Sequence, residues 1–362
     1  MKLKTFLFIV LYVFIFAVIV YFLYIKFYQP FVSKNQGQNI PQGNRQESIY
    51  YTSGNNLYQL DPKASTQSIN SIPTIRLQST GVISKLCVDT KRNQFFYEVS
   101  TPSKNYEIWK VNLKDNSSEK IFSSQTPGLE NFTNFRDPKL SADNENLGFL
   151  ASHDQIDDLF SWQIDQNKLT NLTEEKFAGT ISDFSWGTDT TKIVLSGLIN
   201  GKGVIKTLSE KSISDFLEQD SLINQIEYSK NSLIYSQTPK DAIVTNIATV
   251  SLTNKKVVLL TDIASPKRVS DFAISPDKQE LTFTVNDSSN QQNDIYTLKT
   301  DGTDLLQVTT DGKSSEPTFS PQSDKIAYWD KTIGIFIIPI NKGNAQKVLN
   351  SAGVIDKILA WR

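Results

Sequence analysis

The sequence of 362 residues contains one cysteine, Cys87, and one histidine, His153. A single cysteine excludes an intrachain disulfide, and the two residues together exclude metal sites built from histidine clusters or cysteine pairs. His153 is also the one side chain available as an imidazole base, which restricts acid–base catalysis.

The sequence also lacks an excess of positive charge and the usual catalytic motifs. The net charge is −1, whereas nucleic acids and anionic lipids favour basic surfaces. No Gly-x-Ser-x-Gly motif of a serine hydrolase is present, and Gly201-Lys202-Gly203 is not followed by a helix that could hold a phosphate. We therefore expect no nucleic-acid partner, no cofactor and no enzymatic activity.

Residues 5–25 contain no charged residue at all. At about 1.5 Å per residue, this stretch is long enough to cross a hydrocarbon core of roughly 30 Å. A cleaved signal peptide is the alternative, but its apolar region has about 7–15 residues and precedes a small-x-small site, which is missing here. Lys2 and Lys4 favour a cytoplasmic N-terminus. We predict a transmembrane helix within an anchor of residues 1–28, with the rest of the chain outside the cytoplasm.

Residues 29–46 are rich in Gln, Asn, Gly and Pro, and are predicted to be a flexible linker. From residue 47 to residue 362 a short repeat follows. In its clearest copy, an apolar strand reaches Ile274, a Ser-Pro-Asp turn reverses the chain, and a second strand begins at Leu281.

Seven copies of the first strand can be aligned on their last large apolar residue. These residues recur every 42 to 52 positions and are Val88, Leu140, Trp186, Tyr228, Ile274, Phe319 and Trp361. A period of about 40–50 residues with several short strands is typical of β-propeller blades. All seven second strands alternate as apolar-x-apolar, and we interpret their large side chains as packing between blades. Residues 209–221 do not follow the strand pattern of the repeat, and they could form one or two helical turns inserted after the fourth blade.

The two ends of the repeat region complement each other. The segment Ile355–Trp361 is a first strand without a second, and Ser48–Tyr51 is a second strand without a first. Pairing them builds one blade from both chain ends and removes the exposed sheet edges. The sequence therefore predicts an all-β fold, a seven-bladed β-propeller over residues 47–362 that is closed by its two ends and preceded by one transmembrane helix.

The motif Ser275-Pro276-Asp277-x-x-x-Leu281-x-Phe283, followed by Asp294-Ile295-Tyr296 and a Thr-Asp-Gly turn, resembles the WD40-like repeats of TolB-type β-propellers. Lys278 occupies a position where that family usually has glycine. The resemblance implies protein–protein binding in a bacterial envelope. The same family includes domains attached to serine peptidases and some polysaccharide lyases.

Acidic residues recur three positions before the first-strand anchors. They could form a negative ring at the channel mouth, and they are Asp137, Asp183, Asp271 and Glu316. Two such carboxylates could serve a glycan hydrolase or lyase. The alternative is that each acid hydrogen-bonds backbone at a blade junction.

A second candidate group is His153, Asp154 and Asp157, in a predicted loop distal to the chain ends. Long loops on a rigid scaffold often carry binding residues, and the aspartates, with Asp158, could also bind calcium. The expected function is a membrane-tethered, extracytoplasmic module that binds a protein or an envelope polymer. A glycan hydrolase or lyase remains the alternative.

Overall fold

The computed structural model describes residues 47–53, 56–63, 66–68, 74–76, 81–103, 105–209, 212–340, 343–350, 355 and 357–362. Residues 1–46 form one unit and residues 47–362 another. The predicted membrane span 5–25 and linker 29–46 therefore lie outside the described residues. Within the described residues, no helix has the length and apolar character needed to cross a membrane.

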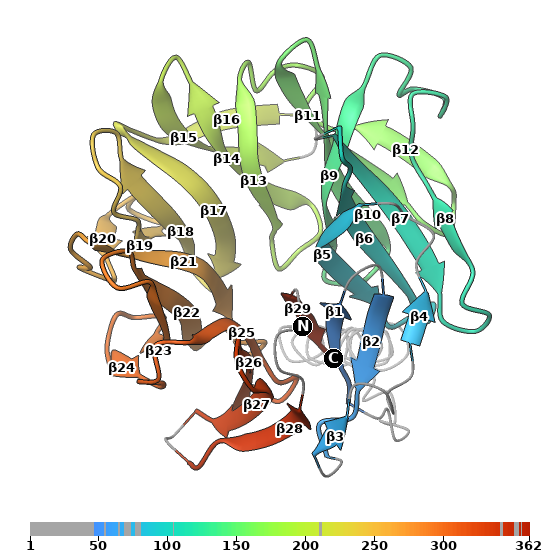
Figure 1. The fold of residues 1–362 in the computed structure, drawn as a ribbon. Coiled ribbons are helices and arrows are strands. Elements are labelled where there is room, and N and C mark those ends of the chain that lie inside the picture. Colours follow the sequence, from blue (N-terminus) through green and yellow to red (C-terminus); the bar gives the residue numbers. More distant parts are fainter. Residues whose placement is uncertain are drawn as a thin grey trace, which may run out of the picture. The chain divides into compact units, whose positions relative to one another are not determined.

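Residues 47–362 form a seven-bladed β-propeller, as the repeat predicts (Figure 1). Each blade is an antiparallel sheet whose strands follow one another from the axis outward, and blade 7 has a fifth, parallel strand. Blade 1 contains β29 (Lys357–Trp361), β1 (Ile49–Ser53), β2 (Asn56–Leu60) and β4 (Thr74–Arg76). Blades 2 and 3 contain β5 (Val82–Asp89), β6 (Gln94–Ser100), β7 (Tyr106–Asn112), β8 (Ser118–Lys120), β9 (Thr133–Leu140), β10 (Asn146–His153), β11 (Ile156–Gln163) and β12 (Lys168–Asn171).

The remaining blades repeat this order. Blades 4 and 5 contain β13 (Thr180–Trp186), β14 (Lys192–Ile199), β15 (Lys202–Ser209), β16 (Ser212–Gln219), β17 (Ser221–Ser229), β18 (Ser232–Pro239), β19 (Asn246–Ser251) and β20 (Val257–Leu259). Blades 6 and 7 contain β21 (Lys267–Ile274), β22 (Glu280–Asp287), β23 (Gln292–Lys299), β24 (Leu306–Gln307), β25 (Ser314–Phe319), β26 (Lys325–Asp330), β27 (Gly334–Pro339), β28 (Gln346–Asn350) and the additional strand β3 (Gln67–Ser68).

The second strands form the core because their neighbouring side chains point to opposite faces of each sheet. In β6, Phe95 and Tyr97 pack against blade 1, whereas Phe96 packs against blade 3. Seven apolar clusters result, one at each junction between blades. The interpretation of these aromatic residues as core residues is confirmed.

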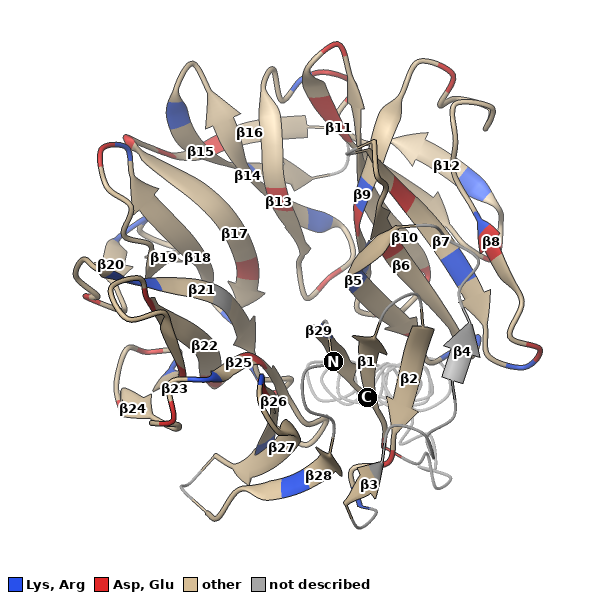
Figure 2. Ribbon diagram, viewed as in Figure 1, with Lys and Arg blue, Asp and Glu red and all other residues tan. Residues whose placement is uncertain are grey.

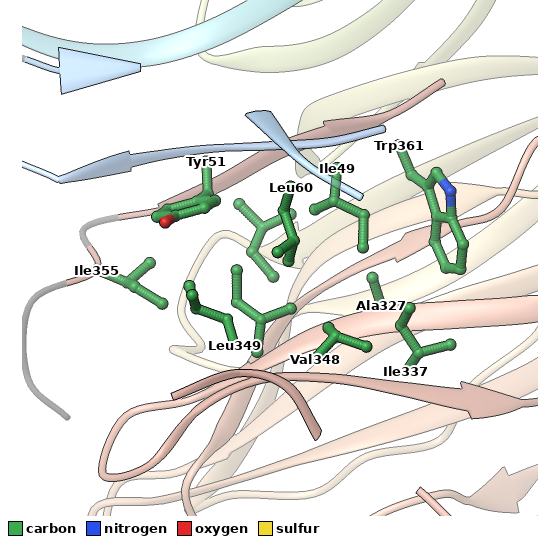
Figure 3. Packing of buried hydrophobic residues seen from close by; sticks show 11 residues of the cluster. Ile49, Tyr51, Leu60, Ala327, Ile337, Val348, Leu349, Ile355 and Trp361 are labelled. Carbon is green, nitrogen blue, oxygen red and sulfur yellow. The ribbon is translucent and has the colours of Figure 1, made fainter. Parts of the chain in front are cut away.

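The predicted closure is also confirmed. The strand β29 pairs antiparallel with β1, with Ile49 opposite Trp361 and Thr52 opposite Lys357. The paired ends bury Ile49, Tyr51 and Trp361 against blade 7 (Figure 3). A second contact, which the sequence did not indicate, comes from β3, which adds parallel to β28 at the outer edge of blade 7.

One expectation is wrong. Residues 212–219 form β16 instead of helical turns, and they pair with β15 from Gly203↔Gln219 to Ser209↔Ser212. This strand lies at the outer edge of blade 4, where all of its side chains are exposed or half-buried. Its apolar alternation is therefore weak, and strand pairing decides its conformation.

Candidate functional site: the axial channel

A channel of about 1100 Å³ runs along the propeller axis, and it is lined by residues of β5, β9, β13, β17, β21 and β29. All seven innermost strands shift register against their second strands, which is the mark of a β-bulge. A bulge leaves one residue unpaired in the ladder and re-aims the side chains around it. We call the side on which the innermost strands end the strand-end face and the opposite side the strand-start face.

The channel wall is basic, although the whole chain has a net charge of −1. Among the described residues that line the channel, two are acidic, Asp183 and Glu227. Seven of the described lining residues are basic, and they are Lys85, Lys139, Lys230, Arg268, Lys278, Lys357 and Arg362. Figure 2 shows acidic and basic positions on the innermost strands around the axis.

Lys139 of β9 links three blades inside the channel. Its Nζ lies 2.8 Å from Asp183 Oδ1 on β13 and 3.3 Å from Glu227 Oε1 on β17. It also donates a hydrogen bond of 2.7 Å to the carbonyl oxygen of Phe184. Burial lowers the pKa of Lys139, but Asp183 and Glu227 outweigh that effect, so the pKa is raised above its ordinary value. Lys139 therefore stays charged and forms an ion pair with both Asp183 and Glu227.

Asp183 serves a blade junction at the same time. Its Oδ2 accepts a hydrogen bond of 3.0 Å from the backbone N–H of Ile226, just after the bulge of the next blade. Gln225, which occupies the equivalent position in blade 5, holds Phe272 of blade 6 through both its amide oxygen and its amide nitrogen. The contact of Asp183 fits the alternative considered for the acids, in which each one hydrogen-bonds backbone at a blade junction.

Asp137 is 4% exposed and lies between blades 2 and 3. Its carboxylate contacts Lys85, and its backbone N–H donates a hydrogen bond of 2.6 Å to Glu98 Oε2. The side chain of Lys85 is 47% exposed, and it lines the channel. Despite the contact with Asp137, burial in the channel lowers the pKa of Lys85, and Lys139 adds to the lowering.

The other two acids of the expected ring are placed differently. Glu316 lies 3.7 Å from Lys357 Nζ, and the side chain of Asp271 lies outside the described residues. Asp137 and Asp183 are each within an ion pair and are buried. The described acids therefore do not form a ring of free carboxylates at the channel mouth.

The residues expected in a distal loop are part of a hairpin. Asp154 and Gln155 form a two-residue turn between β10 and β11, with φ values of 48° and 69°. Two positive φ values are typical of a type I′ hairpin turn, for which Asp-Gln is an unusual sequence. His153 ends β10, pairs with Ile156 and lies near the ring of Phe132. The predicted loop is therefore wrong.

The aspartates of this hairpin point apart. Asp154 is in the exposed turn and lies 3.3 Å from His153 Nε2. Asp157 is buried, is 2.8 Å from Arg136 Nη2 and accepts a hydrogen bond from the backbone of Ile181. Asp158 points to the opposite face of the strand and accepts hydrogen bonds from Asn171, Thr173 and Glu175. Over the described part of the chain, these carboxylates do not converge on one cation position, and no other group of three ligating residues does.

Cys87 also lines the channel. Burial raises the pKa of its thiol to about 12. The thiolate is the reactive form of cysteine, so this side chain is a poor nucleophile at neutral pH.

The sequence reasoning missed Lys139, Glu227, Lys230 and Lys278 as channel residues. Lys139 and Glu227 directly precede the first-strand anchors Leu140 and Tyr228. The equivalent residues Ala273 and Ala360 pack between blades, so this repeat position does not by itself identify the side chains that face the axis.

No protein-family model matches this sequence, and no curated protein matches it. Solved structures are similar in fold, and three of them have TM-scores between 0.52 and 0.58. An oligogalacturonate lyase in complex with manganese has a TM-score of 0.56 and 10% identity over 74% of this chain and 76% of that chain.

TolB from Acinetobacter baumannii has a TM-score of 0.52 and 13% identity, over 74% of this chain and 66% of that chain. A prolyl endopeptidase has a TM-score of 0.58 and 10% identity, over 83% of this chain and 49% of that chain. Identities this low show a shared fold. They support the resemblance to TolB-type propellers at that level, and they assign no activity.

Proposed function

We propose that this chain is a binding module that takes a protein segment or an envelope polymer into its axial channel. The observation that supports this function best is the channel itself, with a volume of about 1100 Å³ and walls from six innermost strands. Ligand sites are commonly concave, preformed cavities with apolar walls and a few convergent polar groups. Here Trp186, Tyr228 and Phe272 line the same cavity as the charged residues.

We further propose that residues 5–25 anchor the chain in a membrane and that the propeller lies outside the cytoplasm. The support is the length of the uncharged stretch and the lysines that precede it. Ser48 and Arg362 exchange backbone hydrogen bonds where β29 ends, so the described part of the chain begins on the strand-end face.

The alternative, a glycan hydrolase or lyase, has one observation in its favour. Two carboxylates, Asp183 and Glu227, line the same channel. A glycosidase, however, needs one carboxyl group that is protonated at working pH. Lys139 Nζ lies within 3.3 Å of an oxygen of each acid and forms an ion pair with both. This arrangement is better suited to holding the blades together than to proton transfer.

The experiment is a pull-down from solubilised membranes with the full-length chain as bait. Thr188→Trp places a bulky side chain at an exposed position of the channel lining. Thr253→Trp makes the same change in the exposed peripheral turn between β19 and β20. Lys240→Glu changes the charge of a loop on the strand-start face.

We expect Thr188→Trp to lose the partner while Thr253→Trp and Lys240→Glu retain it. Equal recovery with all three variants would contradict binding in the channel. The enzymatic alternative is tested by the release of reducing ends from envelope polysaccharide. Activity that disappears in Glu227→Gln, with an unchanged melting temperature, would favour that alternative.

A further inference from the structure

The strand-end mouth of the channel carries three positive charges. Lys230 follows β17, Lys278 follows β21 and Arg362 follows β29, and all three line the same cavity. Within the part of the chain that the structure describes, none of these side chains lies within 4.0 Å of a carboxylate. Charges of like sign around one cavity focus a field that attracts oppositely charged ligands.

The lysines deeper in the channel differ from those at the mouth. Lys85 contacts Asp137, Lys139 lies between Asp183 and Glu227, and Lys357 is 3.7 Å from Glu316. Each of the deeper lysines thus has an acidic partner within the protein. Among the described residues, the three cations at the mouth have no acidic partner, so their charge is available to a ligand that enters the channel.

The backbone at the mouth is strained where the lysines lie. Lys230 and Lys278 have φ values of 47° and 61°, in the left-handed region that disfavours residues with a Cβ. At the equivalent turns of blades 2 and 3, Asn93 and Asn144 adopt this conformation, which asparagine tolerates better. Lysine at such a position is unfavourable for folding. Strain of this kind often marks a functional position.

One further lysine shares this backbone conformation away from the channel. Lys255, with φ 56°, lies in the peripheral turn before β20. Its ammonium group is 5.2 Å from the ring centroid of Phe216, so it has a partner within the protein. Lys255 therefore provides a matched control for Lys230 and Lys278.

We propose that the strand-end mouth of the channel binds a multivalent anion, a short chain of carboxylate or phosphate groups held by Lys230, Lys278 and Arg362. This inference rests on the proposed function and names the chemistry of its ligand. Thr90, Asn144 and Thr188 line the same mouth and supply hydroxyl and amide groups that can donate to anionic oxygens. The channel is large enough to admit several linked anionic groups.

The test is a calorimetric titration of the full-length chain in detergent, with two anionic probes and one neutral probe. Hexaglutamate supplies carboxylates, tripolyphosphate supplies phosphates, and hexaglutamine is the uncharged match for hexaglutamate. The variants are Lys230→Gly, Lys278→Gly and the control Lys255→Gly. Glycine is suited to all three backbone conformations, so each variant is expected to fold.

We expect at least one anionic probe to bind and hexaglutamine not to bind. Which probe binds more tightly tells carboxylate ligands from phosphate ligands. A hydrogen bond to a charged group corresponds to about a tenfold change in affinity or more, so each mouth variant should weaken binding at least about tenfold. Lys255→Gly should leave the affinity unchanged.

The proposal is overturned if neither anion binds, or if Lys255→Gly weakens binding as much as Lys278→Gly. If neither anion binds but the pull-down still fails specifically with Thr188→Trp, the channel keeps its binding role and only the ligand chemistry proposed here is wrong.

Discussion

Ser48 and Arg362 exchange two backbone hydrogen bonds across the join of the propeller. The N–H of Ser48 donates to the carbonyl of Arg362 at 2.6 Å, and the N–H of Arg362 donates back at 2.9 Å. These bonds extend the β1–β29 pairing by one residue pair beyond Ile49 and Trp361. A chain segment near residue 48 and one 314 positions later thus form a single sheet.

The closure predicts a large effect of Trp361→Ala. Trp361 is 2% exposed and packs against blade 7. Truncating a buried tryptophan costs about 3–5 kcal/mol. We expect a loss of that size in the free energy of unfolding, measured by chemical denaturation. Removal of residues 353–362 should abolish cooperative unfolding, and a soluble, cooperatively melting truncation product would contradict the closure.

Lys139→Met should destabilise the propeller more than the loss of an ordinary surface lysine. The substitution leaves Asp183 and Glu227 without their shared cation, and breaking a buried ion pair on one side costs about 3–5 kcal/mol. The control is Lys202→Met, whose side chain is 50% exposed and whose partner Glu218 is 59% exposed, with an expected cost under about 1 kcal/mol. Equal unfolding free energies for the two variants would show that the Lys139 network has no special structural role.

Lys278→Gly should not reduce stability, in contrast to most substitutions. The left-handed backbone at Lys278 costs a residue with a Cβ about 1–2 kcal/mol, while glycine loses about 0.5–1 kcal/mol more entropy on folding. We expect the unfolding free energy to stay level or to rise by about 1 kcal/mol. A clear loss of stability would mean that the lysine side chain makes folding contacts, and it would weaken the functional interpretation of this position.

An ion pair between a turn of blade 2 and a turn of blade 3 should make the stability of the propeller depend on pH. The Arg92 guanidinium, 2.6 Å from Asp165, holds the pKa of that carboxyl at about 2, below its ordinary value of 3.8. A lowered folded-state pKa contributes stability above pH 3.8 that is lost as the pH falls toward 2. At pH 5 the wild type should therefore have a higher melting temperature than the Asp165→Asn variant. The two melting temperatures should converge near pH 2. A constant difference across this range would argue against the linkage.

The fold was predictable because its signals are local and repeated. The first-strand anchors from Val88 to Trp361 and the alternating second strands occur in every copy, so they specify blades without long-range information. The unmatched first and second strands at the chain ends also specified the closure. By contrast, β3 is two residues long and pairs with β28 some 280 positions away, so tertiary structure alone defines it.

The candidate site was less predictable. Counting acids at one repeat position pointed to a negative ring, but the bulge directs Asp183 and Gln225 toward the next blade. The charge of the channel depends on which neighbouring positions face the axis and on which of them have partners. Lys139 and Lys278 differ in this respect, and their difference becomes apparent only once the blades are assembled.

The central claim is that the axial channel is where the partner binds. Photo-crosslinking in native membranes tests it most directly, with a benzophenone amino acid placed in the full-length chain at Thr188, Thr245 or Thr253. Thr188 and Thr245 line the channel, and Thr253 lies in a peripheral turn. The account predicts a light-dependent adduct from one or both channel positions and none from Thr253. An adduct from Thr253 alone would contradict it.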